Sequence, residues 1–391
     1  MAIYKLFPSQ DASIYSGYPA MNTGLDPILD IANFVTESNP VSRVARSIIQ
    51  FDQSEIENVI DSIAIVTGSE FNAWSGSLKA YVAKASNIIL NSSLEIYPLS
   101  GSWNNGTGQY LDNKAATNGV SWVFTDYSGS HKWTTAGWPS LITGSFSGSD
   151  NAGGGEWYTG SGNYSNVSNN LEVTQSYNLR SEKDLDVNVT DILKVWYSSS
   201  KNINQGQIDI ENNGFLIKWA DSEEFVTSSA VSPQLSFYSV DTNTIYPPTL
   251  EISWDDQSFT TGSLNEIYTT DFFASLDSNP GIFYSESVNR FRVNVRPQFP
   301  VRIFQTASID TTNYYLNSSS LYSVKDLDTN ETVINFDNQF TKLSCDSSGN
   351  YFDLYMNGLE PERYYKILIQ TTISGSTIVK DDNYIFKVVN R

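Results

Sequence analysis

The sequence predicts an all-β protein, and two observations support this fold class. Aromatic residues make up 13% of the 391 residues and only 17% are charged, and aromatic side chains favour the half-buried surface of a pleated sheet. Short runs in which apolar and polar residues alternate recur along most of the chain. Ser, Thr, Asn and Gly fill the spaces between these runs, as the turns of a strand-rich fold require.

The first 256 residues contain a series of expected strands separated by turns. Ser42 to Asp52 is typical of them, because Val44, Ile48 and Phe51 lie among polar residues. The other expected strands are Leu78 to Ala85, Ile88 to Tyr97, Gly214 to Trp219, Leu235 to Val240 and Thr249 to Trp254, and alternating strands are expected throughout Ile60 to Tyr97.

One short helix is expected, in the segment DILKVWYS that follows Thr190. The Thr190 hydroxyl is a suitable N-cap, and Ile192, Val195 and Trp196 then fall at i, i+3 and i+4 on one face. We expect this helix to pack on a sheet.

The segment from Gly101 to Asn170 interrupts the pattern of strands. It is rich in Gly and Ser, has no apolar periodicity, and contains the tryptophans Trp103, Trp122, Trp133, Trp138 and Trp157. An irregular insertion of this length inside a compact domain is usually functional or mobile. The indoles can bury against a sheet and anchor the insertion, contact a partner protein, or stack on the sugar rings of a glycan. We expect anchoring, and keep partner contact and glycan contact as alternative roles for these five residues.

A domain boundary is expected just after Asp255 and Asp256. The expected domains are 1–256, with the insertion at about 101–170, then a connecting segment with the first strand region at 257–300, and a β-sandwich at 301–391. Short strands at close spacing predict this sandwich. They are Asn289 to Arg296, a hairpin around Asp328 within Tyr322 to Phe336, Gly349 to Met356, Tyr364 to Gln370, and Tyr384 to Val389.

Charge and composition argue against several partners. The formal net charge is −20, and a surface this acidic repels phosphate backbones and anionic lipid, so neither nucleic acid nor a membrane is an expected partner. The single cysteine, Cys345, argues against an intramolecular disulfide and a cysteine-based zinc site. The start MAIYKLFPSQDASIY lacks a basic leader followed by an apolar segment, so no secretory signal is expected.

Candidates for catalysis are few. His131 is the only histidine, and neither Ser130 nor Asp126 nearby stands in a nucleophile-elbow setting. Two carboxyls at a defined separation can cleave a glycosidic bond, so the acidic residues of the insertion keep hydrolysis as an alternative. These residues are Asp112, Asp126, Asp150 and Glu156. We predict no catalytic residue and a protein that is not an enzyme.

One stretch, DLDTN from Asp326 to Asn330, begins like a calcium-binding loop. Glu331 stands at the sixth position, where such a loop needs glycine for its sharp turn, so a hairpin turn is expected instead. No metal-binding residue and no cofactor are predicted, and a structural calcium ion held by carbonyls and carboxylates is left open.

Several segments of the N-terminal part occur in an order that resembles a known family. The segments are Pro8 to Gly24, Ser42 to Asp52, Leu185 to Trp196, Asn212 to Trp219, and the closing PQLSFYSV and TLEISW. This series resembles the DNRLRE-type jelly-roll domain, a β-sandwich similar to carbohydrate-binding modules and found in surface and virion proteins. The resemblance covers roughly residues 1–256 and implies an N-terminal jelly roll.

The C-terminal part resembles a second group of domains. Gly358 to Pro361 followed by Tyr364 and Tyr365 is similar to the turn and tyrosine corner of immunoglobulin-like and fibronectin-type-III-like domains. The resemblance implies an immunoglobulin-like β-sandwich at the C-terminus.

The whole chain resembles virion structural proteins of tailed bacteriophages, particularly contractile-tailed cyanophages. The start without a leader, the acidic composition rich in Asn, Ser and Tyr, and the passage GLEPERYYKILIQTT carry this resemblance. It implies a non-enzymatic protein made in the host cytoplasm and located in the virion, at the neck, tail, baseplate or fibre attachment, or as capsid decoration. Other virion proteins are the expected partners, in a homo-oligomer or a symmetric array. The alternative is a carbohydrate-binding adhesion module that recognises a host surface glycan.

Overall fold

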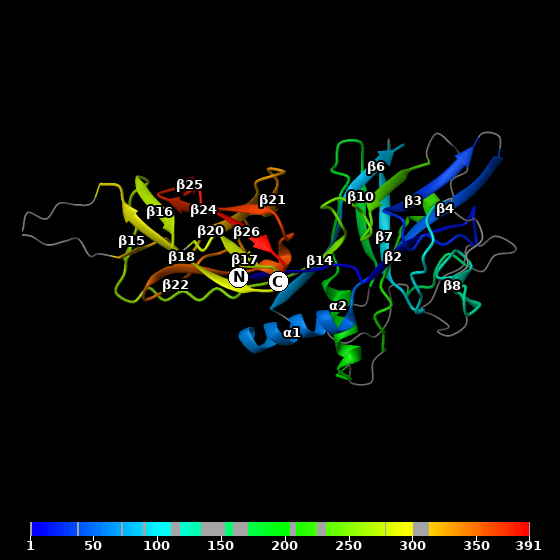
Figure 1. Ribbon diagram of the computed structural model, residues 1–391, viewed down its shortest axis with the longest axis horizontal. Coiled ribbons are helices and arrows are strands. Elements are labelled where there is room, and N and C mark those ends of the chain that lie inside the picture. The colour runs from blue at the N-terminus through cyan, green and yellow to red at the C-terminus, as the bar shows by residue number, and fades with distance from the viewer. Residues whose placement is uncertain are drawn as a thin grey trace, which may run out of the picture. The chain divides into compact units, whose positions relative to one another are not determined.

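The computed structural model describes residues 2–36, 39–71, 73–88, 91–110, 118–133, 153–158, 171–203, 209–224, 232–277, 279–299 and 313–390. Strands dominate these residues, so the protein is all-β, as predicted (Figure 1). Two compact units are formed. The N-terminal unit consists of Leu6–Ser62 and Ser75–Glu251, and the C-terminal unit consists of Met1–Lys5, Ile63–Trp74 and Ile252–Arg391.

The expected division into domains differs in detail from these units. The main change of unit lies after Glu251, within the strand β14 (Thr249–Trp254), and residues from 257 to 299 add strands to the C-terminal unit. The three-part division at 256 and 300 therefore stays a prediction about independently folding domains.

The N-terminal unit contains a large antiparallel sheet with the order β10-β7-β12-β4-β3-β13-β6, in which β2 also pairs with β4. Its strands are β2 (Gln10–Tyr15), β3 (Ile28–Thr36), β4 (Asn39–Gln50), β6 (Val82–Ser86), β7 (Ser92–Pro98), β10 (Val173–Tyr177), β12 (Phe215–Trp219) and β13 (Gln234–Tyr238). In addition, β5 (Trp74–Ala80) pairs with β11 (Leu185–Asn188). The short strands β8 (Phe124–Asp126) and β9 (His131–Lys132) form a hairpin. The strand β1 (Ala2–Leu6) begins the chain, and all of it except Leu6 belongs to the C-terminal unit.

The expected strand from Leu78 to Ala85 is two strands. It is broken at Tyr81, so that β5 pairs with β11 while β6 pairs with β13 at the edge of the large sheet. The alternation of apolar residues continues across Tyr81, so sequence periodicity does not reveal the change of sheet.

The strand β12 shows that both faces of the large sheet are covered. All five of its residues are buried, although successive side chains of a strand point to opposite faces. On one face Phe215 packs on Trp196, with 4.8 Å between ring centroids. On the other face Leu216 belongs to a cluster that includes four tryptophans.

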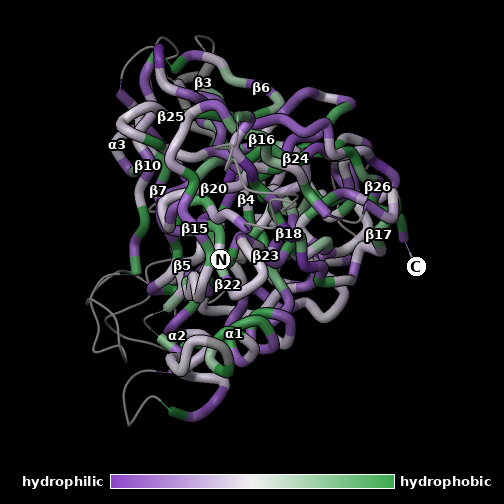
Figure 2. The backbone as a smooth tube through the Cα atoms, turned by 90° about the vertical axis from the view of Figure 1, so that its left-hand side faces the viewer, coloured by the Kyte–Doolittle hydropathy of each residue, from purple (hydrophilic) through white to green (hydrophobic). Residues whose placement is uncertain are grey.

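The helix α1 (Gln53–Thr67) contradicts the expected strands from Ile60 onwards. Its buried residues Ile56, Val59, Ile60 and Ile63 recur at i, i+3, i+4 and i+7, which is the period of one helix face. Asp52 starts the helix, since its carboxylate accepts the backbone N–H groups of Ser54 (2.7 Å) and Glu55 (3.2 Å). The many Ile and Val residues favour a strand by propensity, and the helical period overrides that preference. Figure 2 shows the hydrophobic run within α1.

The helix α2 (Thr190–Ser200) is the predicted one, but Thr190 is not its cap. Val189 occupies the N-cap position without a side-chain hydrogen bond. The Thr190 Oγ1 atom instead accepts the backbone N–H of Gly76 at 2.9 Å and so ties the helix to β5. The predicted apolar face is confirmed, because Ile192, Val195 and Trp196 are all buried. A short third helix, α3 (Asp221–Glu224), follows β12.

The C-terminal unit is a β-sandwich of two sheets. One has the order β15-β19-β18-β23-β22 with β16 paired to β18, and the other has the order β17-β26-β24-β20-β21 with β25 paired to β24. The strands are β15 (Asn265–Glu266), β16 (Phe272–Leu276), β17 (Ile282–Tyr284), β18 (Val288–Pro297), β19 (Tyr314–Tyr315), β20 (Leu321–Asp326), β21 (Thr332–Ile334), β22 (Ser344–Asp346), β23 (Gly349–Tyr355), β24 (Tyr364–Ile373), β25 (Ser376–Lys380) and β26 (Ile385–Val389).

Aromatic rings hold the two sheets of the C-terminal unit together. Phe352 of one sheet stacks on Tyr322 of the other at 4.1 Å between centroids, and Phe291, on the same sheet as Phe352, extends the stack at 5.3 Å. The expected tyrosine corner is present, since the Tyr365 hydroxyl donates to the backbone oxygen of Glu360 at 2.8 Å. These contacts, with the parallel pairing of β17 and β26, agree with the predicted immunoglobulin-like sandwich.

Candidate functional site

Four of the five tryptophans predicted as contact residues form one buried cluster in the N-terminal unit. The exposed fractions are 8% for Trp103, 1% for Trp122, 2% for Trp133 and 6% for Trp157. The cluster lies against residues of β2, β4 and β12, among them Ile14, Ile48 and Leu216. Trp138 lies outside the described residues. Ring faces buried in this way do not offer a platform to a sugar.

The guanidinium of Arg46 lies between two of these indoles. Its Cζ atom is 5.1 Å from the ring centroid of Trp122 and 5.1 Å from that of Trp157. Arg46 is 1% exposed, so these cation–π contacts are formed away from water, where they are strongest. A strand residue, Arg46 of β4, thus fixes two residues of the insertion.

A buried carboxylate neutralises this arginine. Glu224 of α3 is fully buried and accepts Nε and Nη2 of Arg46 at 2.7 and 2.8 Å, which is a two-pronged ion pair. The third nitrogen, Nη1, donates to the backbone oxygen of Gly154 at 2.7 Å. Two stretches of chain far apart in sequence are therefore held by one side chain.

Lys218 of β12 extends the charge network. Its Nζ atom lies 2.9 Å from Glu95, 2.8 Å from Asp221 and 3.9 Å from Glu224. Because Lys218 is 2% exposed, its charge requires these partners. The network joins β4, β7, β12 and α3 on the face that carries the tryptophans.

Glycines bring the insertion close to Arg46. Gly154 and Gly155 have φ values of +86° and +94°, which side chains other than glycine rarely adopt. A Cβ atom at Gly154 would lie 2.7 Å from the Trp122 ring and 2.8 Å from Nη1 of Arg46. Glycine at these positions is thus required for the packing of the insertion against Trp122 and Arg46.

The polar atoms of two indoles are also used within the protein. Nε1 of Trp103 donates to the Asn213 backbone oxygen at 2.8 Å, and Nε1 of Trp133 donates to that of Ser121 at 2.9 Å. The structure therefore gives the four tryptophans a packing role. A role in glycan or partner contact stays a prediction for the five tryptophans.

A further charge, Asp11 of β2, is buried outside this cluster. It is 1% exposed, its Oδ2 atom accepts the backbone N–H of Val240 at 2.7 Å, and its Oδ1 atom has no hydrogen-bond partner among the residues that the structure describes. Burial raises the pKa of Asp11 to about 7; the Val240 hydrogen bond opposes this rise, and the charges of Asp241 and Asp26 add to it.

The residues considered for catalysis do not converge in the part of the chain that the structure describes. His131 is exposed in β9, and the Asp126 carboxylate accepts the N–H and hydroxyl of Ser128. Glu156 is buried, while Asp112 and Asp150 lie outside the described residues. Within the same ranges no group of three or more His, Cys, Asp or Glu side chains is placed to hold a metal ion.

The stretch from Asp326 to Asn330 forms the expected hairpin turn between β20 and β21. The Asp326 carboxylate accepts the N–H groups of Asp328 (2.7 Å) and Thr329 (3.1 Å) and a two-pronged contact from Arg363. The Asp326 carboxylate thus stabilises the turn through hydrogen bonds and an ion pair within the chain.

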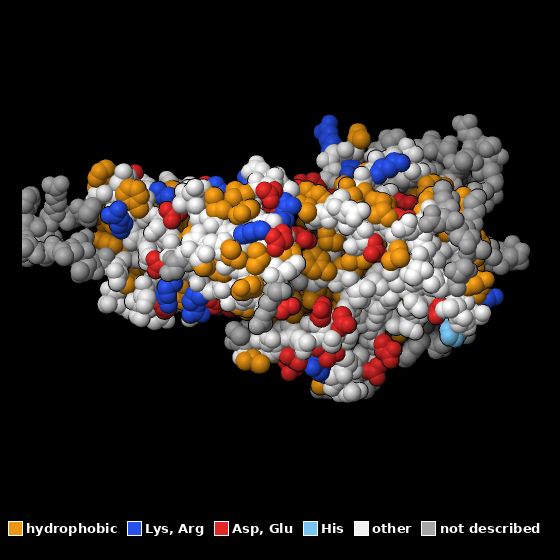
Figure 3. Space-filling view, viewed as in Figure 1, with side chains coloured by type: hydrophobic (Ala, Val, Ile, Leu, Met, Phe, Trp, Pro, Cys, Tyr) orange, Lys and Arg blue, Asp and Glu red, His pale blue; other side chains and the backbone are white. Residues whose placement is uncertain are grey.

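An exposed apolar patch lies on the outer face of the second sheet of the C-terminal unit. Ile282, Lys387 and Tyr364 stand opposite one another on β17, β26 and β24, with Tyr284 and Val389 beside them. Ile282, Tyr284 and Tyr364 are 55%, 56% and 47% exposed. We call these five residues the outer-sheet patch. Figure 3 shows hydrophobic side chains gathered over this region beside basic and acidic ones.

Sequence reasoning missed the part played by charge in the buried cluster. The signals were Arg46 and Lys218, which stand within the apolar runs VARSIIQF and GFLIKW. Charged residues are rarely fully buried without a partner. Arg46 and Lys218 were therefore signals of buried acidic partners, although the sequence does not reveal where those partners are.

No family model matches this chain, and no curated protein matches it. None of the helices in the described ranges has the length and hydropathy needed to cross a membrane.

Proposed function

We propose that this chain is a non-enzymatic structural protein of a bacteriophage virion and that it binds neighbouring virion proteins. The outer-sheet patch is the observation that carries the binding function. Tyrosine and aliphatic side chains exposed together on a sheet face are typical of protein contact surfaces, since tyrosine gives large contact area at low entropic cost. The virion setting rests on the resemblance of the sequence to tailed-phage proteins.

The packing of each unit supports a role that depends on shape rather than on chemistry. The stacked rings of Tyr322 and Phe352 join the sheets of the C-terminal unit, and Arg46, paired with Glu224, fixes part of the insertion in the N-terminal unit. A surface held in place before binding loses little conformational entropy when a partner docks. Repetition around a symmetric particle would multiply a modest contact into stable attachment.

Incorporation into particles tests this proposal. A phage lacking the gene would be complemented with the parent chain or with the double variant Tyr284→Ser and Tyr364→Ser, and the amount of chain in purified particles would be measured. We expect the double variant to be depleted by about tenfold, the size of effect that loss of contact residues produces. Val379→Ser is the matched control, because Val379 is 50% exposed and lies outside the patch.

Equal incorporation of the double variant and the parent would remove the patch from the proposal. Absence of the parent chain from particles would remove the virion role itself. The carbohydrate-binding alternative is checked separately on a glycan array, where a specific signal from the folded parent chain would support it and a clean array would remove it.

A further inference from the structure

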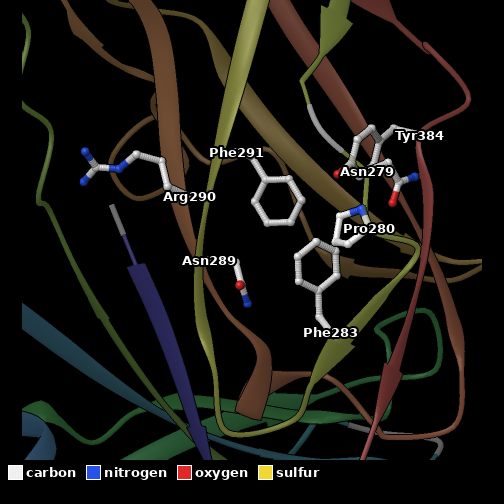
Figure 4. A pocket seen from close by; sticks show the side chains of 7 residues that line it. All are labelled: Asn279, Pro280, Phe283, Asn289, Arg290, Phe291 and Tyr384. Carbon is white, nitrogen blue, oxygen red and sulfur yellow. The ribbon is translucent and has the colours of Figure 1, made fainter.

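The C-terminal unit contains a cavity of about 450 Å³ that opens at the side of the sandwich. Phe283, Phe291 and Tyr384 provide its rings, Pro280 and Asn279 its rim, and Asn289 and Arg290 complete the lining (Figure 4). This volume is within the range of about 300 to 1,000 Å³ that is usual for ligand pockets. The cavity occurs where the chain leaves β16 in one sheet and enters β17 in the other.

The same crossover leaves an open edge on β18. The strand β16 pairs with β18 only from Val293 to Pro297. Just before β18, the backbone oxygen of Ser287 accepts the backbone N–H of Met356, which follows β23. The backbone oxygen of Arg292, within β18, instead accepts the backbone N–H of Asp277, which follows β16. In an antiparallel sheet the N–H and C=O groups of one residue point to the same side of the strand, and the side alternates from residue to residue. The groups of Val288 and Arg290 therefore point to the side of β16, as those of Arg292 do. No described strand pairs with them there.

The interior of the cavity suits an apolar side chain. Phe283 is 9%, Phe291 2% and Tyr384 5% exposed, and Phe283 lies 5.4 Å from Phe291 between ring centroids. The Asn279 amide is occupied, since it donates to the Ile385 oxygen at 2.7 Å and accepts the Gly281 N–H at 2.8 Å.

The Arg290 side chain does not fill the cavity. It is directed away from the rings, on the other side of β18 from Phe291 (Figure 4). Its Nε and Nη2 atoms donate to the Asp353 carboxylate, each at 2.8 Å, and its Cζ atom lies 4.2 Å from the Tyr351 ring centroid. The cavity therefore keeps room for a group from outside.

Among the described charged residues close in sequence to the cavity lining, only acidic ones lack an oppositely charged partner. Asp277, Glu286 and Asp382 each lie within three positions in sequence of a lining residue, and all three are exposed acids that lie between strands. Among the described residues none of these three forms an ion pair with a Lys or Arg side chain. The basic residues equally close in sequence, Arg290, Arg292 and Lys387, are each paired with an acid, which is Asp353, Asp346 and Glu362 respectively. A segment that carries Lys or Arg is electrostatically complementary to this rim.

We propose that the cavity and the open edge of β18 bind an extended segment of a partner protein. The segment pairs antiparallel with Val288–Arg290, on the side of β18 where β16 pairs further along the strand. The side chain of the segment that lies opposite Asn289 or Phe291 points into the cavity. That side chain is aromatic or large and aliphatic, and Lys or Arg residues beside it face the acidic rim. Main-chain pairing gives affinity and the pocket gives specificity, as in other cases of strand addition.

A partner of different sequence fits better than a second copy of this chain. The chain carries a formal net charge of −20, so a second copy would bring like charge to an acidic rim. This inference rests on the proposed function, because it specifies the chemistry of a neighbouring protein that the chain binds.

Selection from a library of short random peptides, with the full chain as bait, tests the site. We expect enriched peptides to alternate polar and apolar residues around one aromatic or large aliphatic position with flanking Lys or Arg. A fluorescein-labelled copy of the most enriched peptide is then titrated against each variant. Its affinity should weaken as salt concentration rises, because the flanking charges are screened.

Two variants at one position separate the backbone edge from the side chain. Arg290→Pro removes the N–H on the open side while the β23 pairing of Asn289 and Phe291 is kept, and Arg290→Ala loses the same ion pair but keeps the N–H. We expect Arg290→Pro to weaken peptide binding by about tenfold or more relative to Arg290→Ala. Asn289→Trp, which fills the cavity, should have a similar effect. Thermal unfolding of each variant checks that the unit is folded.

Three outcomes overturn the inference. They are no enriched peptide class, equal binding by Arg290→Pro and Arg290→Ala with Asn289→Trp unaffected, or self-association of the parent chain that Arg290→Pro abolishes, which would make a second copy the occupant. Each leaves the proposed function testable, because incorporation into particles is measured independently and depends on the outer-sheet patch.

Discussion

Replacement of Asp11 by Asn should stabilise the N-terminal unit in alkaline solution. Burial raises the pKa of Asp11 from 3.8 to about 7, with Asp241 and Asp26 adding to the rise and the Val240 hydrogen bond opposing it. Between these two pKa values the folded chain holds a proton that the unfolded chain has lost. The free energy of unfolding therefore falls as pH rises from about 4 to about 7, and the loss is complete above the folded-state pKa.

The size of this effect follows from the pKa shift. A shift of about three units corresponds to about 4 kcal/mol, since each unit represents about 1.4 kcal/mol. Asn has no ionised form to bury, and its side-chain oxygen can still accept the Val240 N–H. We expect Asp11→Asn to gain up to about 4 kcal/mol over the parent at about pH 8 and little at about pH 4.

Urea unfolding followed by tryptophan fluorescence measures this difference, because the buried tryptophan cluster reports on the N-terminal unit. Asp209→Asn is the control, since Asp209 is an exposed acid of the same unit. A variant that is less stable than the parent at about pH 8, or whose advantage does not change between about pH 4 and pH 8, would refute the reasoning.

Three more predictions concern packing and are checked by the same unfolding measurement. Arg46→Met removes the two-pronged ion pair of the buried Glu224 carboxylate and should cost about 3–5 kcal/mol, while the double variant with Glu224→Met should cost less than the single one. Gly154→Ala should destabilise by more than about 1 kcal/mol, because its backbone conformation and the adjacent Trp122 ring exclude a Cβ atom. Tyr365→Phe removes the hydroxyl of the tyrosine corner and should cost about 1–2 kcal/mol in the C-terminal unit.

The sequence was most informative where one face of a strand is buried and the other is not. In β18 and β24 the alternation of buried and exposed residues matches the pattern read from the sequence, and the hairpin around Asp328 lies where expected. The tyrosine corner was visible as well, because its turn and its tyrosines are adjacent in sequence. Local signals of this kind need no knowledge of distant partners.

The sequence predictions were wrong where the strand propensity of a segment competed with helical spacing of its apolar residues, or where contacts with distant strands decided the structure. The Ile-rich α1 has the composition of a strand but the spacing of a helix face. Tyr81 marks a change of sheet that depends on which strands lie alongside, and Thr190 bonds to Gly76 of a distant strand rather than to its own helix.

The candidate sites were only partly visible in the sequence. The tryptophans stood out by composition, but whether an indole is buried or exposed depends on residues such as Arg46, which is 76 positions from Trp122 in the chain. The open edge of β18 could not be anticipated, because it results from the crossover of the chain between two sheets. Sites made by topology require coordinates.

Cross-linking mass spectrometry on purified phage particles tests the central claim most directly. Lys387 lies in the outer-sheet patch, and Lys366 lies on the same sheet face of the neighbouring strand β24, two residues beyond Tyr364, so both can react with an amine-specific cross-linker. The account predicts that the chain is present in the particles and that these lysines are linked to a different virion protein. Recovery of the chain only from the cytosol of infected cells, and never from purified particles, would contradict it.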